Sequence, residues 1–291
     1  MSSIDHETSP FRPGLFAGRV ALVTGGGTGI GRAIAEELSA LGARVALCGR
    51  RVEPVTELAE ALRAKGAEAH GASVDIRSPE SIDAFVKDVL ARFGTIDLLV
   101  NNAGLAGPRG LTKDGFELTV GTNHLGPFLF TVLLLPRLRE SKPARVVNVA
   151  SKMHAKAPGL GFEHWRTSTR SITGTPEYAV SKLCNVLFTR SLAAGKAGDG
   201  VHSYAVHPGV IASDVWREVS WSVRPIMKRF MKSPEEGAAT SLYCATSPDV
   251  AEHDGRYYDA CREAKPSPLA LDAALAETLW AKSAELVGLG V

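Results

Sequence analysis

The 291-residue sequence has no closely spaced cysteine pair, no marked charge excess and no low-complexity run. The absence of any Cys-x-x-Cys pair argues against a disulfide framework or a zinc site and fits a reducing compartment; the four cysteines are Cys48, Cys184, Cys244 and Cys261. The net charge of +2, from 33 basic and 31 acidic residues, is not the clustered basic excess of a nucleic-acid-binding surface. Residues 1–17 form a polar tail without the apolar core of a signal peptide or a transmembrane segment.

Short apolar runs alternate with helical periodicity from residue 18 onward. Helices are predicted at Gly29–Leu41, at Pro79–Phe93 after the N-cap Ser78, and from Ser233-Pro234 onward. Six runs lack the polar alternation of half-exposed strands, which is typical of strands buried on both faces. These strands are Val20–Thr24, Arg44–Cys48, Ala69–Val74, Ile96–Asn101, Arg145–Val149 and Val201–Val206, with a weaker one near Arg256–Tyr258. The pattern predicts an α/β fold, a doubly wound parallel sheet flanked by helices, as a single domain over 18–291.

A glycine-rich turn follows the first predicted strand and reads Thr24-Gly25-Gly26-Gly27-Thr28-Gly29-Ile30-Gly31. Glycines permit a tight turn and let the backbone approach a pyrophosphate, while the next helix offers free amides and the positive end of its dipole. An ordinary strand–helix turn can carry the same glycines, so the flanking strand and helix support the prediction of a dinucleotide site.

The end of the second strand indicates which dinucleotide binds. A free ribose 2′-hydroxyl usually meets a carboxylate about 20 residues past the glycines, whereas this chain has Cys48-Gly49-Arg50-Arg51. Gly49 leaves room, and Arg50 and Arg51 can pair with a 2′-phosphate, which favours NADP(H) over NAD(H). Alternatively, both arginines are solvated surface residues. Asp75, at the end of the third strand, can accept a hydrogen bond from the adenine amino group or cap the next helix.

Three further segments carry candidate catalytic groups: Asn101–Gly104, Asn148–Ser151 and Tyr178–Lys182. Tyr178 and Lys182 are four positions apart and share one helical face. A phenol has a pKa of about 10, and a nearby ammonium favours the phenolate and brings the pKa toward the working range. Ser151 would then hold the substrate oxygen while Tyr178 exchanges its proton. The Tyr-x-x-x-Lys spacing is common by accident and gains weight from the order of the other motifs.

Together these motifs resemble the classical short-chain dehydrogenase/reductase family over essentially the whole chain from residue 18. The matching segments are TGGGTGIG, Asp75, NNAG, Asn123-His124-Leu125-Gly126, the strand-end serine, YxxSK and Pro208-Gly209. The resemblance implies a Rossmann fold and a catalytic tetrad of Asn123, Ser151, Tyr178 and Lys182, in which Asn123 supports a water-linked proton relay and Lys182 also binds the nicotinamide ribose. It implies that the cofactor is bound by Thr24, Gly25, Thr28, Gly29, Ile30, Gly31, Arg50, Arg51, Asp75, Ile76, Asn102, Ala103, Gly104, Tyr178, Lys182, Pro208, Gly209, Val210 and Ser213.

Within the family, DGFELTVGTNHLGPFLFT, ARVVNVAS, SKLCNVLFTRSLA and YAVHPGV are similar to the retinol dehydrogenase branch, which mostly prefers NADP(H). Animal members of that branch often carry an N-terminal membrane anchor, so we expect this chain to be a soluble, cytoplasmic relative from a bacterium. The usual Ser-Ser pair reads Ala150-Ser151 here, which keeps the second, catalytic serine. The resemblance also implies a homodimer or homotetramer.

Two segments are expected to form the walls of the substrate pocket. The loop between Ser151 and Tyr178 is longer than in many classical members and contains His154, Phe162 and Trp165. The second wall is a lid over about 210–232, with Trp216 and Trp221. Such walls favour a small apolar carbonyl or alcohol; alternatively, the aromatic side chains pack in the core or at a subunit contact. The basic residues of the lid indicate either a membrane-surface helix or a solvated face.

The motifs predict an NADP(H)-dependent oxidoreductase that transfers a hydride between nicotinamide and a carbonyl or alcohol carbon. An NAD-preferring alcohol dehydrogenase is one alternative. The other is a non-catalytic nucleotide-sensing protein of the same fold, which would usually lack the tyrosine or the lysine; both are present here. The histidine spacing predicts no metal site.

Overall fold

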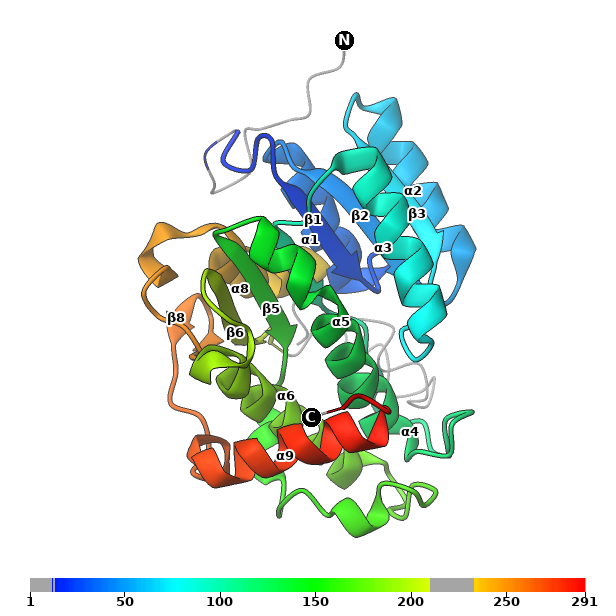
Figure 1. The fold of residues 1–291 in the computed structure, drawn as a ribbon, viewed down its shortest axis with the longest axis vertical. Helices are drawn as coiled ribbons and strands as arrows, with labels where there is room; N and C mark the ends of the chain where they lie inside the picture. The colour runs from blue at the N-terminus through cyan, green and yellow to red at the C-terminus, as the bar shows by residue number, and fades with distance from the viewer. Residues whose placement is uncertain (1–11, 13, 210–232, 291) are drawn as a thin grey trace.

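The computed structural model describes residues 12, 14–209 and 233–290, and one eight-stranded sheet forms its centre (Figure 1). The strand order is β3-β2-β1-β4-β5-β6-β7-β8, parallel from β3 to β7, with β8 antiparallel to β7. The strands are β1 (Val20–Thr24), β2 (Arg44–Gly49), β3 (Ala69–Ser73), β4 (Leu98–Asn101), β5 (Ala144–Val149), β6 (Val201–His207), β7 (Tyr257–Asp259) and β8 (Arg262–Glu263). The predicted fold class is therefore confirmed.

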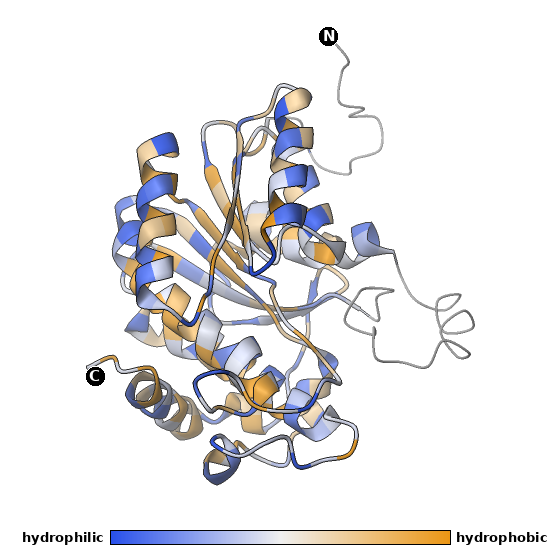
Figure 2. Ribbon diagram, turned by 90° about the vertical axis from the view of Figure 1, so that its right-hand side faces the viewer, coloured by the Kyte–Doolittle hydropathy of each residue, from blue (hydrophilic) through white to orange (hydrophobic). Residues whose placement is uncertain are grey.

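Helices cover both faces of the sheet. The larger ones are α1 (Gly29–Ala40), α2 (Val52–Ala64), α3 (Pro79–Phe93), α5 (Gly126–Glu140), α6 (Thr175–Ser191), α8 (Pro234–Thr246) and α9 (Ala273–Leu286). One buried cluster joins α1, α2 and α8 to one face of the strands, and another joins α3, α5 and α6 to the opposite face. Hydrophobic residues are accordingly concentrated in the sheet between the helical layers (Figure 2). Strands buried on both sides explain why the sequence shows apolar runs without alternation.

The predicted element boundaries differ from the observed ones by a few residues. The fourth strand begins at Leu98 rather than Ile96, where the Asp97 carboxylate accepts a hydrogen bond from Val20 N at 2.8 Å. The short strand β8 was not predicted, because its two residues are exposed and carry no apolar pattern. Phe16, inside the predicted polar tail, is buried in the core. Most of that tail and the 210–232 segment lie outside the described residues, so the predicted domain boundaries stay a prediction.

The helix before and through α5 is the one candidate membrane span that the described ranges contain. It begins as the single turn α4 (Leu118–Val120), continues through the π-helical segment η2 (Gly121–Leu125) and ends with α5. By length and composition Leu118–Glu140 is apolar enough to cross a membrane, but 78% of its apolar window is buried inside the fold, as in a core helix.

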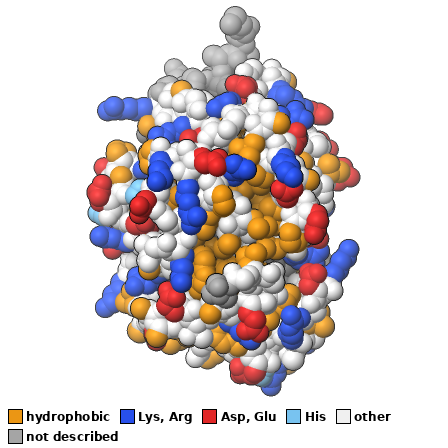
Figure 3. All heavy atoms as spheres, viewed as in Figure 1, with side chains coloured by type: hydrophobic (Ala, Val, Ile, Leu, Met, Phe, Trp, Pro, Cys, Tyr) orange, Lys and Arg blue, Asp and Glu red, His pale blue; other side chains and the backbone are white. Residues whose placement is uncertain are grey.

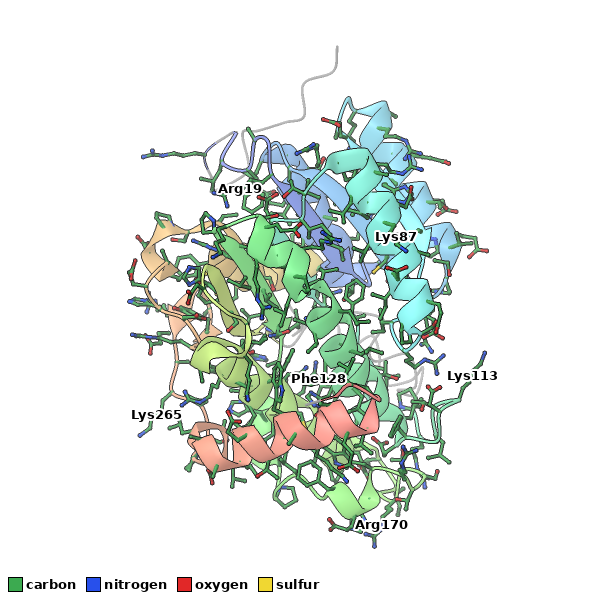
Figure 4. The ribbon with its side chains drawn as sticks, in the orientation of Figure 1. Arg19, Lys87, Lys113, Phe128, Arg170 and Lys265 are labelled. Atoms are coloured by element: carbon green, nitrogen blue, oxygen red, sulfur yellow. The ribbon has the colours of Figure 1, made fainter. Side chains whose placement is uncertain are left out.

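The C-terminal helix α9 crosses the outer side of α5 and α6 (Figure 1). The Trp280 ring of α9 lies 5.0 Å from the Phe128 ring of α5 and 5.9 Å from the Phe188 ring of α6. Figure 4 labels Phe128 just above α9, next to α5. Hydrophobic side chains also gather on this face over α5, next to α9 (Figure 3). The packing of α9 therefore fixes the outer side of the helix that follows η2.

A buried histidine, His124, lies where η2, α6 and α9 meet. It is 1% exposed, and its Nε2 lies 2.8 Å from the Ser283 hydroxyl of α9. Burial lowers the pKa of His124 to about 3, so the folded protein holds the ring neutral at neutral pH.

We expect the free energy of unfolding to fall as the pH drops below about 6.5, the ordinary His pKa. His124 then binds a proton in the unfolded chain but stays neutral in the folded protein. The pH dependence of the free energy of unfolding should be shallower in His124→Gln by up to about 1.4 kcal/mol per pH unit between that value and the folded pKa. Denaturant unfolding of both proteins at several acidic pH values measures this difference. Parallel pH dependences would contradict the prediction.

Candidate active site

The carboxyl ends of β1 and β4 are locked together by Thr24. Its hydroxyl donates to Val100 O at 3.3 Å and accepts from Asn102 N at 3.1 Å and Ala103 N at 3.0 Å. The Asn102 side-chain amide donates back to Thr24 O at 3.0 Å. The predicted cofactor residues Thr24, Asn102 and Ala103 thus form one rigid corner of the site.

The glycine turn next to this corner has no room for side chains. A Cβ on Gly31 would lie 2.3 Å from Gly25 O and 2.4 Å from the Asn102 amide nitrogen. Gly25 has a φ of +64°, and its Cβ would lie 3.1 Å from Ala103 Cα. The backbone can therefore approach a ligand as closely as the sequence argument requires.

The first turn of α1 completes this cradle. Its N-cap Thr28 makes no side-chain cap hydrogen bond, so the amides at Gly29, Ile30 and Gly31 keep their donors for another acceptor. A pyrophosphate fits this arrangement, because it accepts hydrogen bonds and is favoured at the positive end of the helix dipole.

The end of β2 carries two exposed arginines. Gly49 leaves open space, since its Cβ would reach only to 3.5 Å from the nearest atom, a Val55 methyl carbon. Arg50 and Arg51 are exposed, and neither side chain has an ion pair or hydrogen bond with another described residue. Nothing in this part of the structure competes with an anion for these guanidinium groups.

Asp75 is engaged by a neighbour that the sequence reasoning did not consider. Arg77 donates to both of its carboxylate oxygens, at 2.7 and 2.6 Å, and this interaction lowers the pKa of Asp75. The alternative role of Asp75 as a helix cap is wrong, because the Ser78 side chain caps α3. The adjacent Ile76 packs against Gly126 at the start of α5. The adenine contact stays a prediction.

Asn123 is 1% exposed and lies in the π-helical segment η2. Its amide exchanges two hydrogen bonds with the backbone of Leu105, at 2.8 and 2.9 Å, and donates to the Ser181 hydroxyl at 3.0 Å. Gly104 lies against it, since a Cβ there would be 3.2 Å from the Asn123 side-chain oxygen. Asn123 therefore links the loop after β4 to helix α6.

Ser151, Tyr178 and Lys182 are brought together at the carboxyl end of β5. Ser151 hydrogen bonds to the Tyr178 hydroxyl. The Lys182 ammonium donates to Val149 O at 2.8 Å and lies 5.5 Å from the centre of the Tyr178 ring. The structure thus joins the three groups that the motif order suggested; their catalytic roles stay a prediction.

The protonation of this group differs from the sequence expectation. Burial raises the pKa of Tyr178, and its hydrogen bond with Ser151 offsets this only in part. Burial also lowers the pKa of Lys182 to about 8. The expected lowering of the phenol pKa is absent because the ammonium faces the ring and a backbone carbonyl, while desolvation penalises the phenolate.

Two residues expected in the pocket wall support the loop from inside. His154 is 3% exposed; its Nδ1 donates to Ser151 O at 2.7 Å, and its Nε2 accepts from Ser267 N at 3.0 Å. Trp165 is 2% exposed, and its indole N–H donates to Leu160 O at 2.8 Å. Both therefore match the alternative of core packing, while Phe162 is half-buried beside Trp165.

Pro208 and Gly209 follow β6 at the same edge of the sheet as the catalytic candidates. The predicted residues Val210, Ser213, Trp216 and Trp221 lie outside the described residues. Across the described ranges no three His, Cys, Asp or Glu side chains gather as a metal site would need. All four cysteines are free.

The sequence reasoning missed a buried carboxylate, Glu117, next to these groups. It is 3% exposed and accepts hydrogen bonds from Thr119 N and Val120 N at the start of the helix that carries Asn123. A charged residue within the apolar stretch FELTV was the available signal, since buried carboxylates need partners.

Residues 19–222 match the family model described as short chain dehydrogenase. Retinol dehydrogenase 12 of Homo sapiens is 41% identical, over 94% of this chain and 87% of the relative. Retinol dehydrogenase 14 of Mus musculus is 39% identical, over 95% of this chain and 88% of the relative.

Solved structures share the fold of this chain. A crystal structure of an uncharacterised protein from Mycobacterium paratuberculosis has a TM-score of 0.72 and 31% identity, covering 94% of this chain and 95% of that one. A variant of actinorhodin polyketide ketoreductase with NADPH has a TM-score of 0.67 and 30% identity, covering 84% and 95%. The chain therefore belongs to the short-chain dehydrogenase family of nicotinamide-dependent oxidoreductases, and within it resembles the retinol dehydrogenases.

Proposed function

We propose that this protein is an NADP(H)-dependent oxidoreductase that interconverts a carbonyl and an alcohol on a small apolar substrate. One observation supports this proposal most directly. Ser151, Tyr178 and Lys182 lie together at the edge of the sheet that also carries the glycine-rich turn. A cytoplasmic location and a homodimeric or homotetrameric state belong to the same proposal.

Each residue has a distinct task in this reaction. When bound, the nicotinamide supplies or accepts the hydride. The Ser151 hydroxyl orients the substrate oxygen, and the Tyr178 hydroxyl gives a proton to it during reduction and takes one during oxidation. Because burial raises its pKa, Tyr178 keeps its proton at neutral pH and is ready to donate. The Lys182 ammonium, held by Val149 O, would bind the nicotinamide ribose.

Two observations support the finer parts of the proposal. Arg50 and Arg51 lie beside Gly49 and make no side-chain ion pair or hydrogen bond with another described residue, which suits a 2′-phosphate. The ketoreductase of similar fold was solved with NADPH. The relatives named retinol dehydrogenases, together with the half-buried Phe162 of the loop between Ser151 and Tyr178, favour an apolar substrate.

We expect Tyr178→Phe to lower kcat by about 100-fold or more, the usual contribution of a positioned proton donor. NADPH binding should be unchanged, because the ring and Lys182 remain. Turnover of a carbonyl and alcohol panel, followed by NADPH absorbance, and cofactor fluorescence titration measure the two effects. Tyr243→Phe on α8, which removes a phenol hydroxyl outside the site, is the control. Normal turnover by Tyr178→Phe would overturn the assignment of the proton donor.

We expect Arg50→Ala to weaken NADPH binding about tenfold, the equivalent of one charge-assisted hydrogen bond to phosphate, and to leave NADH binding unchanged. Fluorescence titration with both cofactors measures this. Arg92→Ala on α3 removes an exposed arginine that pairs with Asp88, and should change neither affinity. Tighter binding of NADH than of NADPH by the unaltered protein would contradict the cofactor assignment.

A further inference from the structure

Glu117 lies where two loops meet. One loop follows β4 and ends at Glu117, and the other joins Ser151 to Tyr178. One oxygen of its buried carboxylate accepts from Thr119 N at 2.9 Å and from Val120 N at 2.8 Å, so it caps the helix that leads into η2 and Asn123. A carboxylate at this position also interacts favourably with the helix dipole.

The other carboxylate oxygen accepts a hydrogen bond from the Thr169 hydroxyl. Thr169 belongs to the loop between Ser151 and Tyr178, far away in the sequence. The Glu117 backbone reaches the same loop, because its N–H donates to Trp165 O at 2.8 Å. One residue therefore binds the loop through both its backbone and its side chain.

Further contacts lay the two loops side by side. Gly110 N donates to the Thr169 hydroxyl oxygen at 3.1 Å, and within its own loop Gly110 is held by Leu118 N, which donates to Gly110 O at 3.1 Å. At the far end, a Cβ on Gly174 would lie 2.9 Å from Gly107 O. Lys113 and Arg170, which these loops carry, project at the right side and at the bottom of the molecule in Figure 4.

The Trp165 ring continues this chain of contacts toward the tetrad. Its centre lies 5.8 Å from that of His124, the residue after Asn123. A shift of the loop at Trp165 or Thr169 is thus opposed by the same segment that holds the Asn123 amide against Leu105 and Ser181.

We propose that Glu117 is a positioning residue that couples the 152–174 loop to the η2 segment holding Asn123. The Thr169 hydroxyl completes this latch, so the loop that borders the substrate and the turn that carries Asn123 move together. The inference deepens the proposed function and rests on it for its kinetic consequence.

Thr169→Val removes the hydroxyl that donates to Glu117 and also the acceptor for Gly110 N, while valine keeps the shape of the side chain and leaves the Glu117 cap intact. Thr169→Ser keeps the hydroxyl and is the matched control. We expect Thr169→Val to raise KM for the carbonyl substrate about tenfold, the effect of roughly one broken buried hydrogen bond, and to lower kcat as well. NADPH affinity should not change. A fall in kcat at unchanged KM would indicate loss of folded protein and overturn the proposal.

Hydrogen exchange supplies a readout that needs no activity. In Thr169→Val, amide exchange should accelerate both in 165–174 and in 121–125, whereas Thr169→Ser should match the unaltered protein. Acceleration confined to 165–174 would reduce Thr169 to a local loop contact and refute the coupling. A protein that turns over no carbonyl at all would refute the proposed function, while the exchange result would still decide on the latch.

Glu117→Gln and Glu117→Ala separate the charge of the Glu117 side chain from its hydrogen bonds. The glutamine carbonyl can accept from the two backbone amides while its NH2 donates to Thr169, so it should keep both exchange protection and KM. Alanine loses all three hydrogen bonds and should show the Thr169→Val effects in larger measure. Equal behaviour of the two variants would contradict the latch.

Discussion

The buried ammonium of Lys182 is the constraint on which the site depends. The side chain is 5% exposed and donates to Val149 O at 2.8 Å. Taking an ammonium out of water costs several kcal/mol unless it is hydrogen-bonded, and the lowered pKa of Lys182 reflects this cost. Because the side chain starts on α6 and its acceptor ends β5, helix α6 must pack against the carboxyl end of that strand. The same packing places Tyr178, one helical turn earlier, beside Ser151.

Tyr178 shows what residue spacing can and cannot predict. The four-residue interval correctly places the phenol and the ammonium on one side of α6, since helix geometry is local. It does not give the environment of either group. Desolvation depends on how β5, η2 and the long loop close over the helix, and here it outweighs the hydrogen bond with Ser151. The direction of the pKa shift is therefore a tertiary property.

The same distinction applies to the rest of the molecule. The strands, the cap at Ser78 and the crowding at Gly31 follow from short-range patterns and could be predicted. The Arg77–Asp75 pair, the inward position of Trp165 and the Glu117–Thr169 contact lie in loops without periodicity. The Glu117–Thr169 contact in addition depends on which two loops meet, and the local sequence pattern does not show that. Trp165, an aromatic residue in a long loop, was predicted to form a pocket wall. Its indole N–H instead donates to a backbone carbonyl, and the ring is buried in the core.

The long loop between Ser151 and Tyr178 is held at both ends and in the middle. A segment of this length joining Ser151 to Tyr178 would let the two residues drift apart if it were free, because long loops hold many conformations. Both of its ends are held. His154 ties the Ser151 backbone to Ser267, and the Glu177 carboxylate accepts from Arg170 N and Ser171 N immediately before Tyr178. The middle is held separately by Glu117. Residues between these anchors can change as long as the three anchors, including the Glu117 contact that reaches the Asn123 segment, keep the proton-transfer geometry.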